Sequence, residues 1–164
     1  MAWANQEVIG EISKLPQEAL DAYIVNPEWT VGKIIRHIAS GSNWYVWRLL
    51  NHENFNEEEK EFWNTRLQDA EEDAQLMQDP ANVLTILKDS DTWLLEQSKL
   101  PDGDVLREFR RERYIFKRST ILAQAVHHAT EHRAQAVAAL DLRGFGPINL
   151  DRYDLWNYQI RVGE

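Results

Sequence analysis

The chain has 164 residues, of which 43% are hydrophobic and seven are Trp, so it can form a globular core and is not a disordered polypeptide. Its net charge of −9 disfavours a general nucleic-acid or anionic-membrane binder, because both need a surplus of Lys and Arg to neutralise phosphates. The absence of cysteine excludes disulfides, thiolate zinc sites, iron–sulfur clusters and a cysteine nucleophile. Any metal must be held by His, carboxylate or water, and any reacting thiol must arrive on a cosubstrate.

Two further absences bear on the cellular location of the protein. No apolar run approaches the roughly 18 residues of a membrane span. The first residues, MAWANQEVIGEISKLP, have neither a basic leader nor an apolar stretch of signal-peptide type. We therefore expect a cytoplasmic protein that does not associate with membranes, with residues 1–164 forming a single domain.

Two helices are predicted in the first part of the chain. Helical spacing of apolar residues begins at Ala2, and Pro16 breaks or restarts the helix before about Val25. Thr30 is placed to cap a second helix that runs to about His52. The main buried stripe of this second helix consists of Val31, Ile35, Ile38, Ser42, Tyr45 and Leu49.

His37 lies at the edge of that stripe, close to Gly41. Glycine inside a helix costs about 1 kcal/mol relative to Ala. The missing side chain would leave room beside His37 for another helix, a ligand or a cofactor. Alternatively, Gly41 only permits close helix packing and His37 is a partly exposed polar residue.

The middle of the chain predicts two more helices and an ambiguous segment. Asn56 and Asp79 are placed to cap helices, with Pro80 at the first position of the second one, which runs to about Ser98. The carboxylates of residues 57–61 and 71–73 fit a solvated helix face better than a metal or catalytic site. Residues 104–117 fit two short strands or an irregular crossover. The basic and aromatic residues there suit an anionic cosubstrate or internal salt bridges better than nucleic acid, because acids interrupt the run.

One long helix is predicted from Arg118 to Leu142, with Ser119 or Thr120 as its cap and Gly144 as its left-handed stop. Its buried face contains Ile121, Leu122, Ala125, Ala129, Ala136 and Leu140. After Gly144, the aromatic residues Tyr153, Trp156 and Tyr158 predict a tail that packs back on the helices.

His132 falls in the middle of the buried face of this helix, and His128 lies one turn earlier. Two imidazoles four residues apart lean the same way and are able to bind one divalent ion. The alternative is a pair of ordinary core histidines. In a bundle of amphipathic helices, His37 from the second helix would complete a three-histidine site, leaving a fourth position open as catalytic metals require.

Three phrases of the sequence resemble the DinB/YfiT-like superfamily over nearly the whole chain. They are WTVGKIIRHI, which contains His37, HHATEHRAQ, which begins at His127, and the aromatic tail that follows Asp151. The resemblance places the ligand roles on His37, His128 and His132 and excludes His127. Where family members frequently have Gly after the Arg of the second phrase, this chain has Ala134, which bears on helix packing there.

The resemblance implies an all-α, up-down-down-up four-helix bundle with a short extra helix and a C-terminal aromatic tail. It also implies a divalent metal, often nickel or zinc, frequent homodimers, and no DNA binding. Some members are thiol S-transferases that use bacillithiol, mycothiol or glutathione, others resemble metal-dependent hydrolases, and many have no assigned reaction. We therefore expect a metal-activated thiol or water to attack a small-molecule substrate. Gln124 and Gln135 are candidates to orient an imidazole or the substrate, or are ordinary surface residues.

Two competing interpretations remain. Residues 128–132 also read as H-x-x-E-H, the phrase of inverted zinc metalloproteases, in which Glu131 would be the general base. A peptidase needs a third ligand well downstream, and only 32 residues follow His132, although Glu131 could still act near the metal. The second alternative is a dimeric bundle that binds a ligand or partner without chemistry, its metal structural or absent.

Overall fold

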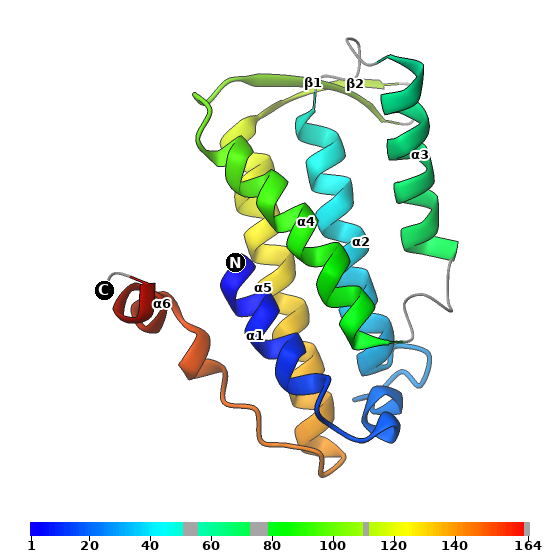
Figure 1. Ribbon diagram of the computed structural model, residues 1–164, viewed down its shortest axis with the longest axis vertical. Coiled ribbons are helices and arrows are strands. Elements are labelled where there is room, and N and C mark those ends of the chain that lie inside the picture. The colour runs from blue at the N-terminus through cyan, green and yellow to red at the C-terminus, as the bar shows by residue number, and fades with distance from the viewer. Residues whose placement is uncertain (51–55, 73–78, 110–111, 163–164) are drawn as a thin grey trace.

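A helical bundle with one small hairpin forms the computed structural model of the chain (Figure 1). The structure describes the backbone of residues 1–50, 56–72, 79–109 and 112–162, and their side chains except 66–72, 107–109, 112 and 162. The bundle consists of α1 (Ala2–Ile12), α2 (Val31–Leu49), α4 (Pro80–Ser98) and α5 (Arg118–Leu142). Because α2 and α4 run opposite to α1 and α5, the predicted up-down-down-up all-α bundle is confirmed.

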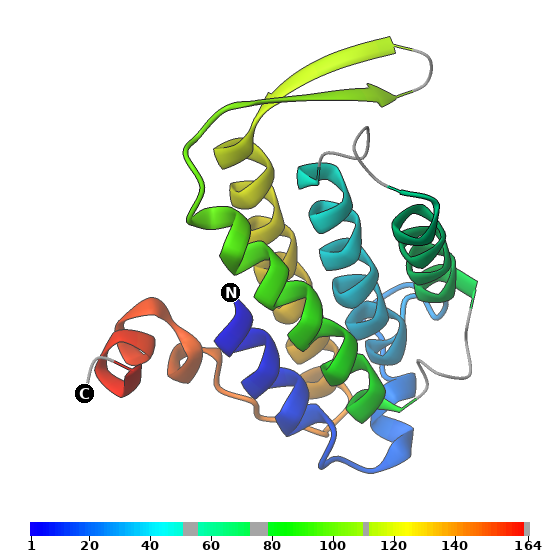
Figure 2. The ribbon, with the colours of Figure 1, turned by 45° about the horizontal axis from the view of Figure 1, so that its top comes forward.

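The additional helix α3 (Glu57–Glu72) makes the return crossing between the parallel helices α2 and α4 and packs outside the bundle against α2 (Figure 2). The acidic side chains that it presents among residues 57–61 are mostly exposed, as predicted, whereas Asp73 lies outside the described residues. Among the described residues, no helix is both long enough and apolar enough to cross a bilayer.

Three of the predicted helix starts are confirmed by hydrogen bonds. Thr30 Oγ1 accepts from the Lys33 amide at 3.3 Å, and Asp79 Oδ1 accepts from the Ala81 amide at 2.9 Å. Asn56 and Glu59 cap each other reciprocally, with distances of 2.8 and 2.9 Å between side-chain oxygen and backbone nitrogen. The first helix ends at Ile12, and after Pro16 only a short 3₁₀ turn, η1 (Gln17–Asp21), follows.

Residues 104–109 and 112–117 form two short paired strands, called the hairpin below, which is one of the two predicted alternatives. Strand β1 (Asp104–Phe109) pairs antiparallel with β2 (Glu112–Lys117), with Val105 opposite Phe116 and Leu106 opposite Ile115. Arg110 and Arg111, two of the predicted basic residues, lie outside the described residues. The last residue of β2 is followed directly by α5.

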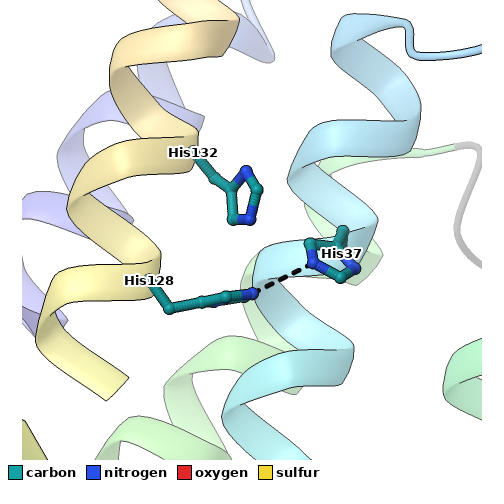
Figure 3. A group of neighbouring side chains, drawn as sticks. All are labelled: His37, His128 and His132. Atoms are coloured by element: carbon teal, nitrogen blue, oxygen red, sulfur yellow. Dashed lines mark hydrogen bonds between the residues drawn. The ribbon is translucent and has the colours of Figure 1, made fainter. Parts of the chain in front are cut away.

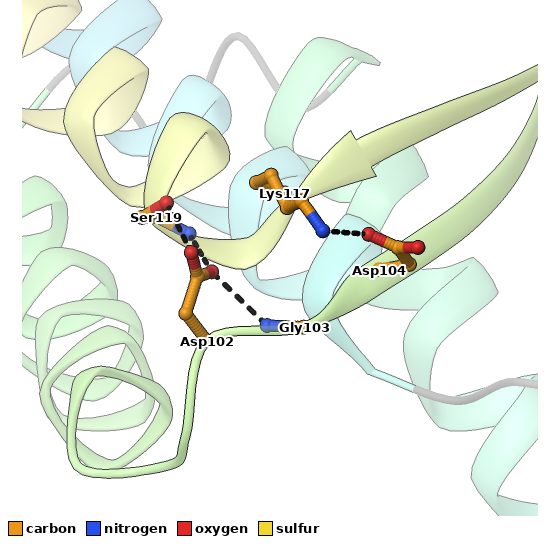
Figure 4. A network of polar contacts seen from close by, with 5 residues as sticks. All are labelled: Asp102, Gly103, Asp104, Lys117 and Ser119. Atoms are coloured by element: carbon orange, nitrogen blue, oxygen red, sulfur yellow. Dashed lines mark hydrogen bonds and ion pairs between the residues drawn. The ribbon is translucent and has the colours of Figure 1, made fainter.

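The predicted side-chain cap of α5 is wrong. The helix starts at Arg118 with Lys117 as the N-cap residue, so Ser119 and Thr120 already lie inside the first turn. Asp102 replaces the missing cap: its carboxylate accepts from the Ser119 amide and hydroxyl, both at 2.9 Å (Figure 4). These bonds lower the pKa of Asp102. The Lys117–Asp104 ion pair lies beside them at the base of the hairpin.

The core consists of two clusters of buried apolar side chains along the bundle. The larger cluster joins α1, α2 and α4 to the second half of α5, including Ile38 and Ala129. The smaller cluster joins the end of α2 to α3, β1 and the first half of α5, including Val46 and Ala125. Of the predicted α5 face, all members are buried except Leu122, which is partly buried. Along α2, Gly41 lies between residues of the larger cluster and residues of the smaller one, and His128 does so along α5. These two helices pack against each other.

The C-terminal segment packs back on the bundle only in part. Gly144 ends α5 with φ +81°, as predicted, and the chain continues into η3 (Leu150–Tyr153) and α6 (Leu155–Val162). The rings of Tyr153 and Tyr158 contact Trp3, with centroid distances of 5.8 and 5.6 Å. Trp156, by contrast, is 77% exposed, so its predicted packing is wrong. In the short helix α6, Trp156 and Tyr158 do not share a face.

A buried polar cluster links α1, α4 and α5 inside the bundle. Asn5 of α1 donates from Nδ2 to Asp91 Oδ2 of α4 at 3.3 Å, and Arg133 of α5 donates to Asn5 Oδ1 and, at 3.0 Å, to Thr130 Oγ1. Asn5, Asp91 and Arg133 are 0%, 4% and 8% exposed. Burial raises the pKa of Asp91 to about 6, against the opposing effects of Asn5, the Met1 amino group and Arg133.

The raised pKa of Asp91 predicts a pH-dependent stability difference between the wild type and Asp91→Asn. The folded state keeps the Asp91 proton to a higher pH than the unfolded chain, so ionisation costs stability as pH rises from about 4 to about 6. The variant has no such proton, so its free energy of unfolding relative to wild type should increase between pH 4 and 7, by up to about 3 kcal/mol. Urea unfolding at both pH values measures this difference, and a difference independent of pH would contradict it.

Candidate metal centre

Three histidine side chains converge between the facing helices α2 and α5 (Figure 3). His37 extends from α2 toward α5, and His128 and His132 extend from successive turns of α5 toward α2. The side chains on α5 lean the same way because four residues make slightly more than one helical turn. The structure therefore brings together the three residues that the sequence singled out.

The ring nitrogens of the three histidines are close enough to share one ion. One nitrogen from each ring lies within 4.8 Å of the others. His128 Nε2 and His37 Nε2 are 3.0 Å apart. Two nitrogens bound to one tetrahedral zinc ion lie roughly 3.3 Å apart, given Zn–N distances of about 2.0–2.1 Å. The arrangement thus fits a divalent ion with small adjustments of the rings.

Two of the three rings are held in the neutral form that a metal requires. Burial lowers the pKa of His128 to about 4, with further contributions from His132, His37 and His127. Burial, followed by the neighbouring His132, also lowers the pKa of His37. A neutral imidazole has a free lone pair, so protons compete weakly with a metal at these two positions.

Gln135 and Trp29 fix the orientation of His132. The indole Nε1 of Trp29, which is only a donor, lies 3.2 Å from Gln135 Oε1, so this atom of the amide is the accepting oxygen. His132 Nδ1 lies 2.9 Å from the same oxygen and must therefore carry the hydrogen. In the neutral ring this tautomer leaves Nε2 without a hydrogen and able to bind a metal.

Gly41 leaves the space that the His128 ring fills. A Cβ atom at position 41 would lie 2.5 Å from Cε1 of His128 and 3.2 Å from its Nε2. The sequence allowed another helix, a ligand or a cofactor in this space, and the structure places a side chain of the facing helix α5 there. The fit of this ring against the bare α2 backbone supports a site built for His128 in this position.

A pocket of about 440 Å³ opens beside the histidines. His37 and His128 form part of its wall, and its other lining residues come from α2, β2 and the first turns of α5. They are Gly41, Trp44, Tyr45, Arg48, Phe116, Thr120, Ile121 and Gln124. The ring of Tyr45 also packs edge-on against His128, with 5.6 Å between centroids. A small molecule with an apolar part would therefore reach the two imidazoles from this side.

Comparison with known proteins identifies the family. The family model described as DinB family matches residues 1–161. The chain belongs to the DinB family. Comparison with curated proteins and with solved structures gives no match.

Three further positions on α5 that the sequence singled out are Gln124, Glu131 and Ala134. Gln124 lines the pocket beside the histidines, together with His128. Glu131 is exposed, and its carboxylate lies 3.8 Å from Nδ1 of the exposed His127. The catalytic role predicted for Glu131 stays a prediction. Ala134, which replaces the frequent glycine of the family, is exposed and meets no packing restriction.

Sequence reasoning on this DinB-family chain missed the contribution of Trp29. Its ring packs edge-on against His37 and His132, with centroid distances of 5.2 and 5.8 Å, in addition to its bond to Gln135. The residue stands directly before the Thr30 cap, inside the phrase that carries the family resemblance. That position was a usable signal, because a residue next to a helix cap is held in a defined direction.

Replacing Gly41 with Ala in this DinB-family chain should weaken metal binding without unfolding the bundle. The new methyl group would push the His128 ring out of its place against α2, whereas Ala is intrinsically the better helix residue by about 1 kcal/mol. We expect metal affinity to fall at least about tenfold, as for other changes that misplace a ligand. Metal titration measures the affinity, and thermal unfolding of the metal-free protein measures the stability of the bundle. An unchanged affinity would contradict the close contact between position 41 and the His128 ring.

Proposed function

We propose that this DinB-family chain is a metal-dependent enzyme in which His37, His128 and His132 hold one divalent ion, nickel or zinc. Its nucleophile is a low-molecular-weight thiol or water. The observation that carries the proposal is the convergence of three ring nitrogens, from two helices, within 4.8 Å. Three protein ligands leave a further coordination position open, which is the arrangement of catalytic sites and not of closed structural ones.

The residues around the site support chemistry on a small molecule. The ion, when bound, would lower the pKa of a thiol or water at its open position and supply a nucleophile at neutral pH. Gln135 keeps the His132 hydrogen on Nδ1, so that Nε2 remains available. Trp44, Tyr45 and Phe116 offer apolar walls to the substrate, and Thr120 and Gln124 offer polar groups. The chain contains no cysteine, so a reacting thiol must come from a small molecule.

A transfer assay distinguishes the two nucleophiles. The metal-loaded protein is mixed with 1-chloro-2,4-dinitrobenzene and bacillithiol, mycothiol or glutathione. In a productive reaction a carbon–sulfur bond forms, the carbon–chlorine bond breaks, chloride leaves, and the thiol proton passes to solvent. We expect turnover with at least one thiol that disappears on chelation and returns with the metal. Turnover of an activated ester without thiol would instead identify water as the nucleophile.

The same assay is able to overturn the proposal. A protein that binds its metal stoichiometrically but turns over neither substrate type, and loses only thermal stability on chelation, would be a non-catalytic bundle. His128→Ala must also be inactive, because a rate that survives loss of a ligand would come from free metal or a contaminant.

Replacing Gln135 with Leu should weaken the site through His132. The variant removes the oxygen that accepts from both Trp29 and His132, so the ring loses its fixed orientation and its Nδ1–H tautomer. Loss of such a partner typically costs about 10- to 100-fold in metal affinity. Competition titration against a chelator of known affinity measures the loss. A variant with wild-type metal affinity would show that the hydrogen bond to Gln135 does not determine the orientation of the His132 ring.

A further inference from the structure

A second cavity lies on the bundle, and it shares no lining residue with the pocket beside the histidines. Its volume is about 290 Å³, and it is bounded by α1, α4, α5 and the C-terminal segment. A cavity of roughly 150 Å³ holds one benzene ring, so this one has room for one or two rings with a short side chain. Trp3, Leu94, Leu122, Tyr153 and Tyr158 give it a largely apolar, partly aromatic wall.

A buried carboxylate with one free oxygen forms part of this wall. Asp91 is 4% exposed, and its Oδ2 accepts from Asn5. Its Oδ1 has no hydrogen-bond partner and less than 1 Å² of accessible surface, so the carboxylate must turn toward the cavity to meet a ligand there. A buried carboxylate oxygen without a donor costs free energy, and a ligand that supplies the donor would recover it.

The charges around the cavity favour a cationic donor. The charged side chains in its lining are Asp91 and Asp154, and the basic side chain of Arg161 lies beside an aromatic wall residue, with its guanidinium carbon 5.8 Å from the centroid of the Trp3 ring. Arg133 lowers the pKa of Asp91 from nearby, but its guanidinium donates to Asn5 and Thr130. The Met1 amino group also faces Asp91, and burial lowers the pKa of that amino group. At pH 7.5 Asp91 is ionised, because its pKa is about 6.

We propose that this second cavity binds a small organic cation, a protonated amine on an apolar body of one or two rings, whose ammonium group donates to Oδ1 of Asp91. The rings lie against Trp3, Tyr153 and Tyr158, and the amine extends inward to α4. Aromatic walls suit such a ligand doubly, because they pack on its rings and attract its charge. The site is independent of the metal centre and of the reaction proposed there.

Tryptamine and tryptophol are the probes, because they have the same ring system and differ in a charged amine against a neutral hydroxyl. Binding is followed at pH 7.5 by the indole N–H signals in nitrogen-15 spectra, assigned by Trp3→Phe and Trp44→Phe. Trp3 lines the second cavity, and Trp44 lines the pocket beside the histidines. We expect tryptamine to shift the Trp3 signal and not the Trp44 signal, and to bind at least about tenfold more tightly than tryptophol.

Two variants test the location and the role of Asp91. Asp91→Asn retains an oxygen for Asn5 and should weaken tryptamine at least about tenfold while leaving tryptophol nearly unchanged. Asp154→Asn is the matched control: it removes the same charge from an exposed carboxylate that Asn157 already engages at 2.8 and 3.0 Å, so its effect should be small. Leu95→Trp, at a partly exposed lining position, should fill the cavity and abolish binding in a folded protein.

Several results would overturn the proposal. They are equal binding of the two probes, an unchanged tryptamine affinity in Asp91→Asn, a shift of Trp44 in place of Trp3, or no shift at millimolar probe. Binding that survives Leu95→Trp would contradict the location. The titration is repeated with His128→Ala, which removes a proposed metal ligand at the other site. The Trp3 shift should persist in this variant, because the amine in the second cavity does not bind the metal.

Discussion

Replacing His128 with Ala should abolish stoichiometric metal binding and leave the bundle folded. Nε2 of His128 lies 3.0 Å from Nε2 of His37, and the His128 ring fills the space over Gly41. The variant keeps two of three protein ligands, which is below the number that known zinc sites use. We expect metal affinity to fall by more than about 100-fold, since even loss of an outer hydrogen-bond partner costs about 10- to 100-fold.

The adjacent His127 provides the matched control for this variant. Its side chain is 73% exposed and pairs with Glu131, so His127→Ala changes the same residue type one position away and should retain the metal. The melting temperatures of the two metal-free variants should lie within a few degrees of wild type, because neither ring belongs to the apolar clusters. Stoichiometric metal in His128→Ala would contradict the assignment of this ligand.

Replacing Arg133 with Ala should destabilise the folded protein by roughly 3–5 kcal/mol, the cost of breaking a buried charged pair or network. The guanidinium is 8% exposed and joins α5 to α1 through Asn5 Oδ1. Its removal leaves that oxygen without its donor and creates a cavity inside the bundle. It also removes the cation that faces the buried Asp91. Urea unfolding at pH 7 gives the free-energy difference.

A double-variant cycle separates the network from the cavity. If the hydrogen bond to Asn5 matters, the effects of Arg133→Ala and Asn5→Ala should not add, with a coupling of at least about 0.5 kcal/mol. Arg152→Ala, at an exposed position of η3, should change stability by less than about 0.5 kcal/mol. A loss below about 1 kcal/mol for Arg133→Ala would contradict the proposed role of the network.

The bundle itself was predictable because its signals are local. Thr30 and Asp79 stand directly before periodic apolar segments and Asn56 before a run of Glu, and each side chain caps its helix as expected. The 3.6-residue period also placed His128 and His132 on one face of α5 and His37 on α2, which needed only the packing of those two helices to become a site.

Other features depend on contacts between distant residues and leave no local pattern. Asp102, 17 residues before Ser119, replaces the side-chain cap expected for α5, because the hairpin returns the chain to that point. Gly41 was noticeable as a helix glycine, but the sequence could not say that the ring of His128 would occupy its space. The pairing of Asn5 with Asp91 spans 86 residues and likewise emerged only from the packed helices.

Metal content of the purified, untagged wild type and His37→Ala, by element-specific mass spectrometry, tests the three-histidine site most directly. His37 is the one ligand that α2 contributes, so this variant tests the cross-helix site itself. We predict about one nickel, zinc or similar divalent ion per wild-type chain and its loss in His37→Ala. A wild-type protein that holds no metal, even after incubation with several divalent ions, or a His37→Ala variant that keeps a full equivalent, would contradict the metal centre.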